Sequence, residues 1–519
     1  MELNRCSGVL LHPTSLPGRY GIGSFDREAY EWIEFLISTE QSIWQVLPLG
    51  PTSFGDSPYQ SFSTHAGNPY LIGLQKLSAE GLLDPQELND APAEVTSDPG
   101  RVDFGVIYHW KLGILRRAVA NLYLPNNEAK LKHFKEYCSK EAEWLNDYAL
   151  FMALKDAHQG CAWTEWEQPL RDREPAALEQ ARQDYAKEIE AYCFMQWVFT
   201  IQWNALRSYA NDNGIKILGD IPIFVAMDSA DAWANPELFH FDMATKQPTC
   251  VAGVPPDYFA LDGQLWGNPL YNWKAMKSKR YAWWIARFRS ALARYDMVRI
   301  DHFRGFDEYW EVPAGAATAR SGKWVKGPGA DLFKALQKVF GNELPIVAED
   351  LGDITDSVYE LRDKFKLPGM KVLQFAFGPG CWGGHPFLPH NYPENCIAYT
   401  GTHDNDTARG WYEQSSTNEE RDHFRRYFAT DGWDMAWTMI RGIFASHAKV
   451  AIVPVQDILD LGSQARMNKP GEPYGNWTWR IFPGQLNEFA ANRLRDITLL
   501  YGRERNVRPN PNKSDDKKL

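Results

Sequence analysis

The chain has 519 residues, with 55 lysines and arginines against 66 aspartates and glutamates, and a formal net charge of −11. This length accommodates a barrel domain of about 250 residues with large insertions, or two to three separate domains. The acidic balance disfavours binding to a phosphate backbone, so nucleic acid is not expected as a partner.

No apolar run reaches the roughly 20 residues that cross a bilayer, and the first residues show no basic stretch followed by an apolar one. The seven cysteines are scattered and include no CxxC pair, which is typical of reduced and mostly buried thiols. We therefore expect a soluble, cytoplasmic protein without a membrane partner. The sequence does not indicate an oligomeric state.

Aromatic residues are abundant, with 21 tryptophans and 23 tyrosines. Many of them are expected to fill a large core, because each buries a large apolar area. A flat indole or phenol ring also stacks well on the apolar face of a pyranose. The composition therefore fits a carbohydrate ligand.

Short apolar runs predict eight β-strands, and from the third onward these are separated mainly by helix-like stretches such as Asp331–Phe340, Ile354–Lys364 and Glu419–Phe428. This alternation is typical of an α/β fold with a parallel (β/α)8 barrel, the TIM barrel. The predicted strands are Gly8–Leu11, Ile43–Leu47, Ile215–Gly219, Met297–Ile300, Pro345–Ala348, Met370–Phe375, Cys396–Tyr399 and Val450–Val453.

Two segments are too long for simple connections, so we predict a single elaborated catalytic domain over residues 1–504 with large insertions. Residues 51–213 are expected to form a mainly helical subdomain. Residues 228–273 are rich in Pro, Gly, Asp and aromatic residues, and predict a long ordered loop over the barrel mouth. The polar tail, 505–519, is predicted to be disordered. The amphipathic patterns of the first insertion lie around Tyr108–Leu122, Ala129–Leu154 and Asp184–Ala210.

Three carboxylates follow predicted strands directly or closely, namely Asp301, Glu349 and Asp404. The carboxyl ends of barrel strands meet at one face, where such enzymes build their active sites. Glycoside cleavage needs one protonated carboxyl group, which protonates the leaving oxygen, and one carboxylate, which attacks C1 or activates water. Three convergent acids at this face therefore suggest sugar chemistry.

The neighbours of the acids suggest a role for each. Arg299 projects to the same side of its strand as Asp301 and would keep that aspartate ionised as a nucleophile. Glu349 follows an apolar run that would raise its pKa and make it the acid, although the adjacent Asp350 complicates this. Asp404 follows His403, and both are candidates to hold sugar hydroxyls.

Other interpretations of these residues stay open. The pairs Asp301–His302 and His403–Asp404 offer residue types that also bind metals on barrel strands, although no HExxH or other tight ligand spacing supports a metal. Any one of the acids is also expected, about as often as not, to be a helix cap or an ion-pair partner. All three being structural is a weaker interpretation.

Long ordered stretches of the chain resemble the 4-α-glucanotransferases, known as amylomaltases or disproportionating enzymes and related to the α-amylase barrel enzymes. The resemblance covers nearly the whole chain apart from the tail. The stretches that carry it are Gly8–Pro17, Asp56–Gln60, Gly219–Ile223, Gly253–Phe259, Gly263–Pro269 and Asn476–Arg480.

This resemblance implies retaining transfer of a 4-α-glucanosyl segment from one α-1,4-glucan to the 4-OH of another or of glucose. It implies that Asp301 is the nucleophile, Glu349 the acid and then base, and Asp404 the residue that stabilises the transition state. Maltooligosaccharides and α-1,4-glucans are the implied partners, with no metal and no organic cofactor. The implied substrate-binding residues are Ser57, Tyr59, Asp220, Gln264, Trp266, Arg299, His403 and Asn468.

Three rival functions are an α-glucan hydrolase, a non-catalytic glucan-binding protein and a metal-dependent barrel hydrolase. The three intact acids argue against the non-catalytic protein, and excess chelator would separate the metal-dependent one. The loop with the adjacent Pro255 and Pro256, followed by Asp257, Tyr258 and Phe259, is expected to favour a sugar acceptor over water.

Overall fold

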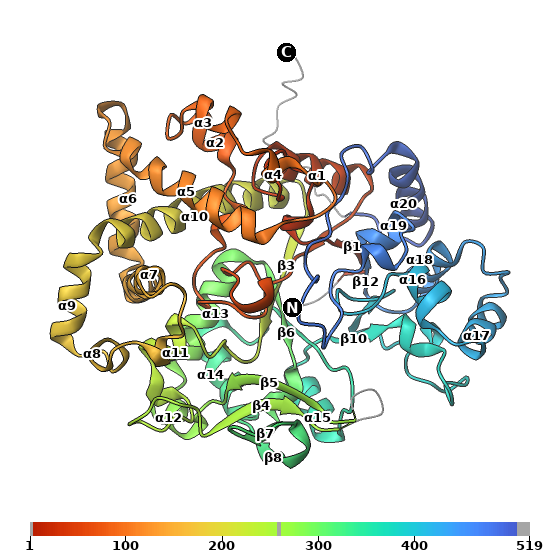
Figure 1. Ribbon diagram of the computed structural model, residues 1–519. Helices are drawn as coiled ribbons and strands as arrows, with labels where there is room; N and C mark the ends of the chain where they lie inside the picture. The colour runs from red at the N-terminus through yellow and green to blue at the C-terminus, as the bar shows by residue number, and fades with distance from the viewer. Residues whose placement is uncertain (1–3, 257–260, 506–519) are drawn as a thin grey trace.

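The computed structural model describes residues 4–256 and 261–505. A parallel sheet of eight strands, in the order β10-β11-β12-β1-β2-β3-β6-β9, curls around the centre of the molecule (Figure 1). Each strand overlaps one of the apolar runs, so the predicted (β/α)8 barrel is confirmed. The strands are β1 (Cys6–Leu10), β2 (Ile43–Gln45), β3 (Lys216–Pro222), β6 (Met297–Asp301), β9 (Ile346–Ala348), β10 (Gly369–Val372), β11 (Cys396–Tyr399) and β12 (Val450–Pro454).

The barrel strands are short. Their residues are largely apolar, as expected for strands that are covered on both faces. Every residue of β9, β10, β11 and β12 is buried. One of the few polar contacts inside is the hydrogen bond that the Tyr399 hydroxyl donates to Gln45 Oε1 at 2.9 Å.

An aspartate side chain takes part in joining β9 to β10. The Ala348 N–H donates to the Pro368 carbonyl at 2.9 Å, while the Met370 N–H donates to Asp350 Oδ1 at 2.7 Å. A Cβ at Gly369 would lie 2.3 Å from Asp350 Oδ2, so only glycine admits the carboxylate here. Asp350 also pairs with Arg362 at 2.5 Å and thus serves the barrel rather than the neighbouring Glu349.

Nine α-helices lie between β2 and β3, within the segment expected as a helical insertion, and Figure 1 shows most of them on one side of the barrel. The single pattern around Ala129–Leu154 is split at Glu141 into two helices, α6 and α7. The nine are α2 (Leu74–Ala79), α3 (Pro85–Asn89), α4 (Ala93–Thr96), α5 (Phe104–Leu122), α6 (Glu128–Lys140), α7 (Ala142–Ala157), α8 (Gln168–Arg171), α9 (Pro175–Asp184) and α10 (Ala186–Asp212).

The other helices lie between or after barrel strands, as the βα alternation predicts. The predicted helical stretches near 331–340, 354–364 and 419–428 correspond to α14, α15 and α17. These helices are α1 (Arg27–Ser38), α11 (Ala230–Ala234), α12 (Trp273–Ser278), α13 (Ala282–Arg294), α14 (Ala330–Phe340), α15 (Asp356–Lys364), α16 (Ala408–Gly410), α17 (Asn418–Phe428), α18 (Met435–Ala445), α19 (Val455–Ile458) and α20 (Glu488–Leu500).

Residues 228–273 are more regular than the predicted long loop. They contain α11 and two strands, β4 (Cys250–Val254) and β5 (Gln264–Pro269). These pair with β7 (Glu308–Pro313) and β8 (Lys323–Lys326) in an antiparallel sheet of order β5-β4-β7-β8, which Figure 1 shows at the edge of the barrel.

Parts of two predictions lie outside the described residues. Asp257, Tyr258 and Phe259 of the predicted mouth loop are among them, as is nearly all of the predicted tail, 506–519. Across the described ranges, no helix is both long enough and apolar enough to cross a membrane.

Candidate active site

The three predicted acids all lie at the carboxyl-terminal ends of barrel strands. Asp301 is the last residue of β6, and Glu349 immediately follows β9, the neighbour of β6 in the sheet. Asp404 lies in the loop that follows β11. The barrel therefore presents the three carboxyl groups at one face, as expected for this fold.

Arg299 lies between two carboxylates on the barrel floor. Its Nη1 is 2.6 Å from Asp220 Oδ2 and its Nη2 is 2.8 Å from Asp301 Oδ1. Burial alone would lower the pKa of Arg299, but the charges of Asp220 and Asp301 raise it well above its ordinary value. The guanidinium therefore stays charged and makes a charge-assisted contact with each of the two carboxyl groups.

Asp220 at β3 is nearly inaccessible to solvent. Burial raises its pKa to about 7, although Arg299 and the Tyr59 hydroxyl oppose this shift. Tyr59 donates to Asp220 Oδ2 at 2.9 Å, while Asp220 Oδ1 is buried and has no hydrogen-bond partner among the described residues.

Glu349 is held by two backbone donors. Its Oε2 accepts from the His302 N–H at 2.8 Å and its Oε1 from the Leu351 N–H at 2.9 Å. Burial, reinforced by the charge of Asp301, raises the pKa of Glu349 to about 8, while Arg299 and the two N–H groups oppose the shift. Glu349 is therefore a carboxyl group that retains its proton near neutral pH.

Asp404 is fixed by residues from a distant part of the chain. Asn468 Nδ2 donates to Asp404 Oδ1 at 2.6 Å, and His403 Nε2 lies 3.3 Å from Asp404 Oδ2. Arg466 donates to the Asp404 carbonyl at 2.6 Å. The loop after β12 thus orients the carboxylate that follows β11.

Three aromatic rings pack together beside these acids. Tyr59 stacks on His403 with centroids 5.1 Å apart, and Trp477 contacts both rings at 5.9 Å. Ser57 Oγ accepts from the Tyr59 N–H at 3.2 Å and so shapes the turn that presents Tyr59.

The antiparallel sheet brings two further predicted residues to the nucleophile. Trp266 on β5 meets the His302 ring edge to face, with centroids 4.8 Å apart, and donates to Gln264 Oε1 at 3.1 Å. His302 follows Asp301 in a left-handed conformation with φ of 56°. Burial lowers the pKa of His302 to about 4, and within the part of the chain that the structure describes its buried Nε2 has no hydrogen-bond partner.

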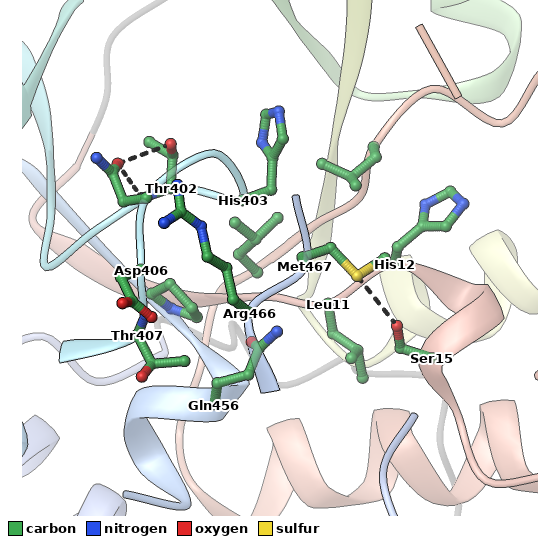
Figure 2. A pocket seen from close by; sticks show the side chains of 14 residues that line it. Leu11, His12, Ser15, Thr402, His403, Asp406, Thr407, Gln456, Arg466 and Met467 are labelled. Atoms are coloured by element: carbon green, nitrogen blue, oxygen red, sulfur yellow. Dashed lines mark hydrogen bonds between the residues drawn. The ribbon is translucent and has the colours of Figure 1, made fainter. Parts of the chain in front are cut away.

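A small cavity lies behind His403. Figure 2 shows His12, His403, Arg466 and Met467 among its lining residues, with the Ser15 hydroxyl bonded to Met467 Sδ. Burial, together with His403, lowers the pKa of His12 to about 3, and burial also lowers that of His403. Both imidazoles are therefore neutral at physiological pH.

These contacts join every predicted catalytic and substrate-binding residue into one continuous cluster. Sequence reasoning assigned no substrate role to His302, Trp477 or His12. The signal for His302 was its position beside the nucleophile, and Trp477 and His12 lie inside stretches that carried the family resemblance. Among the residues that the structure places, no group of three or more His, Cys, Asp or Glu side chains is arranged to hold a metal.

Comparison with known proteins identifies the class of this barrel. The family model described as 4-alpha-glucanotransferase matches residues 11–484. The chain is 51% identical to a 4-alpha-glucanotransferase of Thermus thermophilus, over 95% of this chain and 98% of that protein. It is 48% identical to the Synechocystis 4-alpha-glucanotransferase, over 96% and 98% of the two chains.

A solved structure agrees with these matches. The amylomaltase from Streptococcus agalactiae in complex with acarbose superposes with a TM-score of 0.92 at 41% identity, covering 96% of this chain and all of that one. The fold and the sequence matches define a transferase that acts on α-1,4-glucans. The chain belongs to the 4-alpha-glucanotransferase family.

Proposed function

We propose that Asp301, Glu349 and Asp404 carry out the family's transfer reaction. Asp301 attacks C1 of the donor glucan while Glu349 gives its proton to the leaving glycosidic oxygen, which forms a glucosyl ester on Asp301. The 4-OH of an acceptor then attacks C1, its proton passes to Glu349, and the Asp301 carboxylate is released. Two displacements at C1 retain the α configuration.

The contrast between Asp301 and Glu349 is the observation that carries this assignment. Asp301 is paired with Arg299 at 2.8 Å, which favours a charged nucleophile. Glu349 has its pKa raised to about 8 by burial and by Asp301, which favours an acid. A cationic partner at one carboxyl group and a raised pKa at the other support distinct nucleophile and acid roles.

Asp404 is assigned to the ring hydroxyls of the reacting sugar. The Asn468 amide at 2.6 Å and the His403 ring hold its carboxylate in a fixed orientation. A carboxylate held in advance stabilises the developing positive charge of the transition state without reorganising. Ser57, Tyr59, Asp220, Arg299 and His403 are assigned to the walls and floor of the same sugar site.

Transfer requires that a sugar acceptor reach C1 before water does. Water at about 55 M against an acceptor at roughly millimolar has an advantage on the order of 10⁴–10⁵, which acceptor positioning and water exclusion must overcome. We assign this task to Gln264 and Trp266 on β5, because Trp266 contacts His302 beside the nucleophile.

Incubation with pure maltotriose tests the proposed reaction. Transfer produces glucose together with a ladder of longer maltooligosaccharides, while the number of reducing ends stays constant. Shorter sugars alone, with a rise in reducing ends, would identify a hydrolase. Excess chelator in a parallel incubation is expected to leave the ladder unchanged, and its loss would support the metal-dependent alternative.

The Asp301→Asn variant separates catalysis from binding. Turnover is expected to fall by several orders of magnitude while glucan binding persists, because shape remains and the attacking charge is lost. Turnover near the wild-type rate would reject Asp301 as the nucleophile.

We also propose a cytoplasmic location, supported by the free thiols of all seven cysteines.

A further inference from the structure

An indole outside the acid cluster is unusually exposed and yet firmly supported. Trp382 is 63% exposed, and one face of its ring stacks on His423 of α17 with centroids 5.2 Å apart and an interplanar angle of 29°. His423 is backed in turn by Phe377, whose ring meets it edge to face at 5.5 Å. The second face of the indole is therefore presented to solvent by a fixed support.

The loop that carries Trp382 is tied down by its own backbone. The Trp382 N–H donates to the Gly380 carbonyl at 3.0 Å, and the His385 N–H donates to the Trp382 carbonyl at 2.7 Å. Asn391 Nδ2 and His390 Nε2 each lie 2.8 Å from the Gly383 carbonyl. Ligand binding to this loop would therefore order few additional groups.

Glycines stand two residues before Trp382 and at the two positions after it. Among the described residues, and apart from chain neighbours, a Cβ at Gly380, Gly383 or Gly384 would meet no atom within 4 Å, so the space beside these glycines is open. A stable protein interface needs roughly 800 Å² from each partner, and these glycines add little apolar area. A flat ring with open surroundings instead suits a single pyranose ring.

This loop begins at the rim of the active site. It follows β10, whose carboxyl end lies on the face that carries the acids. Gln374 Nε2, just before the loop, donates to the Asp406 carbonyl at 2.8 Å, and Asp406 lies in the segment that contains Asp404. A glucan chain that leaves the site on this side would pass toward the loop.

We propose that Trp382, supported by His423, is a platform that binds an α-1,4-glucan chain outside the catalytic cluster. The proposal rests on the proposed function, since it takes the same glucan as its ligand. Its role is to hold long donors or acceptors, such as amylose, whereas a trisaccharide bound at the acids does not need it. The ring that Trp382 stacks on, His423, and its backbone hydrogen-bond partners, Gly380 and His385, are not residues that we assign to catalysis.

The chain offers a matched control in Trp433. This indole is 85% exposed, in the loop between α17 and α18, and no aromatic ring of the described residues stacks on it. If an exposed indole binds sugar only through its apolar character, replacing Trp382 and replacing Trp433 should weaken glucan binding equally. If glucan binding depends on a ring that is held in place in advance, only the replacement of Trp382 should weaken it.

Binding is measured by affinity electrophoresis through amylose gels in the Asp301→Asn background, where turnover does not interfere. Trp382→Ala is expected to weaken retention by amylose about 3- to 10-fold, in line with the loss of one aromatic stacking contact. Trp382→Phe should retain most of the binding, His423→Ala should show a smaller loss, and Trp433→Ala should match the parent. When Trp382→Ala is the only substitution and Asp301 is intact, the enzyme should keep the wild-type kcat/KM for maltotriose.

Equal amylose retention by Trp382→Ala and its parent would overturn the proposal, as would an equal loss in Trp433→Ala. A changed oligomeric state with unchanged retention would assign the indole to a protein interface instead. Unaltered melting transitions ensure that a loss reflects binding. If the wild type fails to convert maltotriose while the Asp301→Asn protein still binds amylose through Trp382, the proposed function fails and the platform stands.

Discussion

Asp301 ends β6 and Glu349 immediately follows the adjacent strand β9, yet the two carboxyl groups have different surroundings. Arg299, two residues before Asp301, reaches the same side of β6 and binds it directly. Glu349 follows three buried apolar residues and receives only backbone donors. Residue choice within a few positions thus gives one carboxyl group an arginine partner and the other an apolar setting that raises its pKa.

The pH dependence of transfer follows from Glu349. Its pKa is raised to about 8, so the acid form is lost as the pH rises through that value. We expect kcat/KM for maltotriose to fall about tenfold for each pH unit well above 8. A rate profile from pH 5 to pH 10 checks this, and a constant rate up to pH 10 would exclude Glu349 as the acid.

Replacing Asn468 tests the orientation of Asp404. Asn468→Ala removes the donor 2.6 Å from Asp404 Oδ1, and kcat is expected to fall by roughly 10- to 100-fold, because hydrogen bonds to charged groups are strong. Asn476→Ala is the control. Asn476 Oδ1 accepts from the Lys469 N–H in the same loop without touching Asp404. An equal loss of kcat in the two variants would show that catalysis depends on the shape of the loop and not on the hydrogen bond to Asp404.

At the residue scale, sequence reasoning named the residues whose signal was local. An apolar run followed by an acid marked each carboxylate, and Arg299 was placed by the alternation of side chains along a strand. The left-handed turn of His302 and the packing of Trp477 on Tyr59 depend on contacts between segments far apart in the chain. No local pattern encodes such contacts, so these residues received no substrate role.

At the scale of elements, the main difference from prediction is the β5-β4-β7-β8 sheet. Residues 250–254 and 264–269 are short and contain Gly and Pro, which favours a loop interpretation. The two segments pair with each other, and β4 also pairs with β7, which begins only at Glu308, so part of the sheet is nonlocal. The sheet gives Trp266 a rigid base beside His302.

Widening the β4–β5 pair is expected to impair acceptor use. A Cβ at Gly253 would lie 2.6 Å from the Gln264 carbonyl oxygen, so Gly253→Ala should displace Gln264 and Trp266. Hydrolysis should rise relative to transfer, measured as reducing ends gained against glucose released from maltotriose.

The matched control is Gly113→Ala in α5, where the nearest atom outside the helix backbone is Arg117 Nη1 at 3.8 Å. This variant should leave the ratio unchanged. A folded Gly253→Ala protein with an unaltered ratio would remove the β4–β5 pair from acceptor selection.

At the scale of the whole molecule, the alternation of apolar runs and helices sufficed to predict the barrel, because each strand is buried on both faces. The single pattern around 129–154 did not reveal its break at Glu141, since helix-like periodicity continues on both sides. The closing contact between β9 and β10 depends on Asp350 and Gly369, which no strand pattern indicates.

The active site is expected to cost stability. The pKa of Glu349 is raised from 4.5 to about 8 on folding, so between these values the native state holds a proton that the unfolded chain releases. Stability therefore falls as the pH rises through this window. Glu349→Gln does not titrate, and its melting temperature should exceed that of the wild type by roughly a few degrees at pH 8.5.

Calorimetry at both ends of this window measures the effect. The difference between Glu349→Gln and the wild type should shrink as the pH approaches 4.5. A difference that is independent of pH would show that packing, rather than the buried charge, separates the two proteins.

Trapping the covalent intermediate tests the central assignment most directly. The Glu349→Gln variant, given an α-glucosyl fluoride, should still form the ester because fluoride leaves without a proton, but should resolve it slowly because the base is missing. Mass spectrometry of a peptic digest is expected to find one glucosyl group on the peptide that contains Asp301. A label on a peptide with Asp404, or on any residue other than Asp301, would contradict the account.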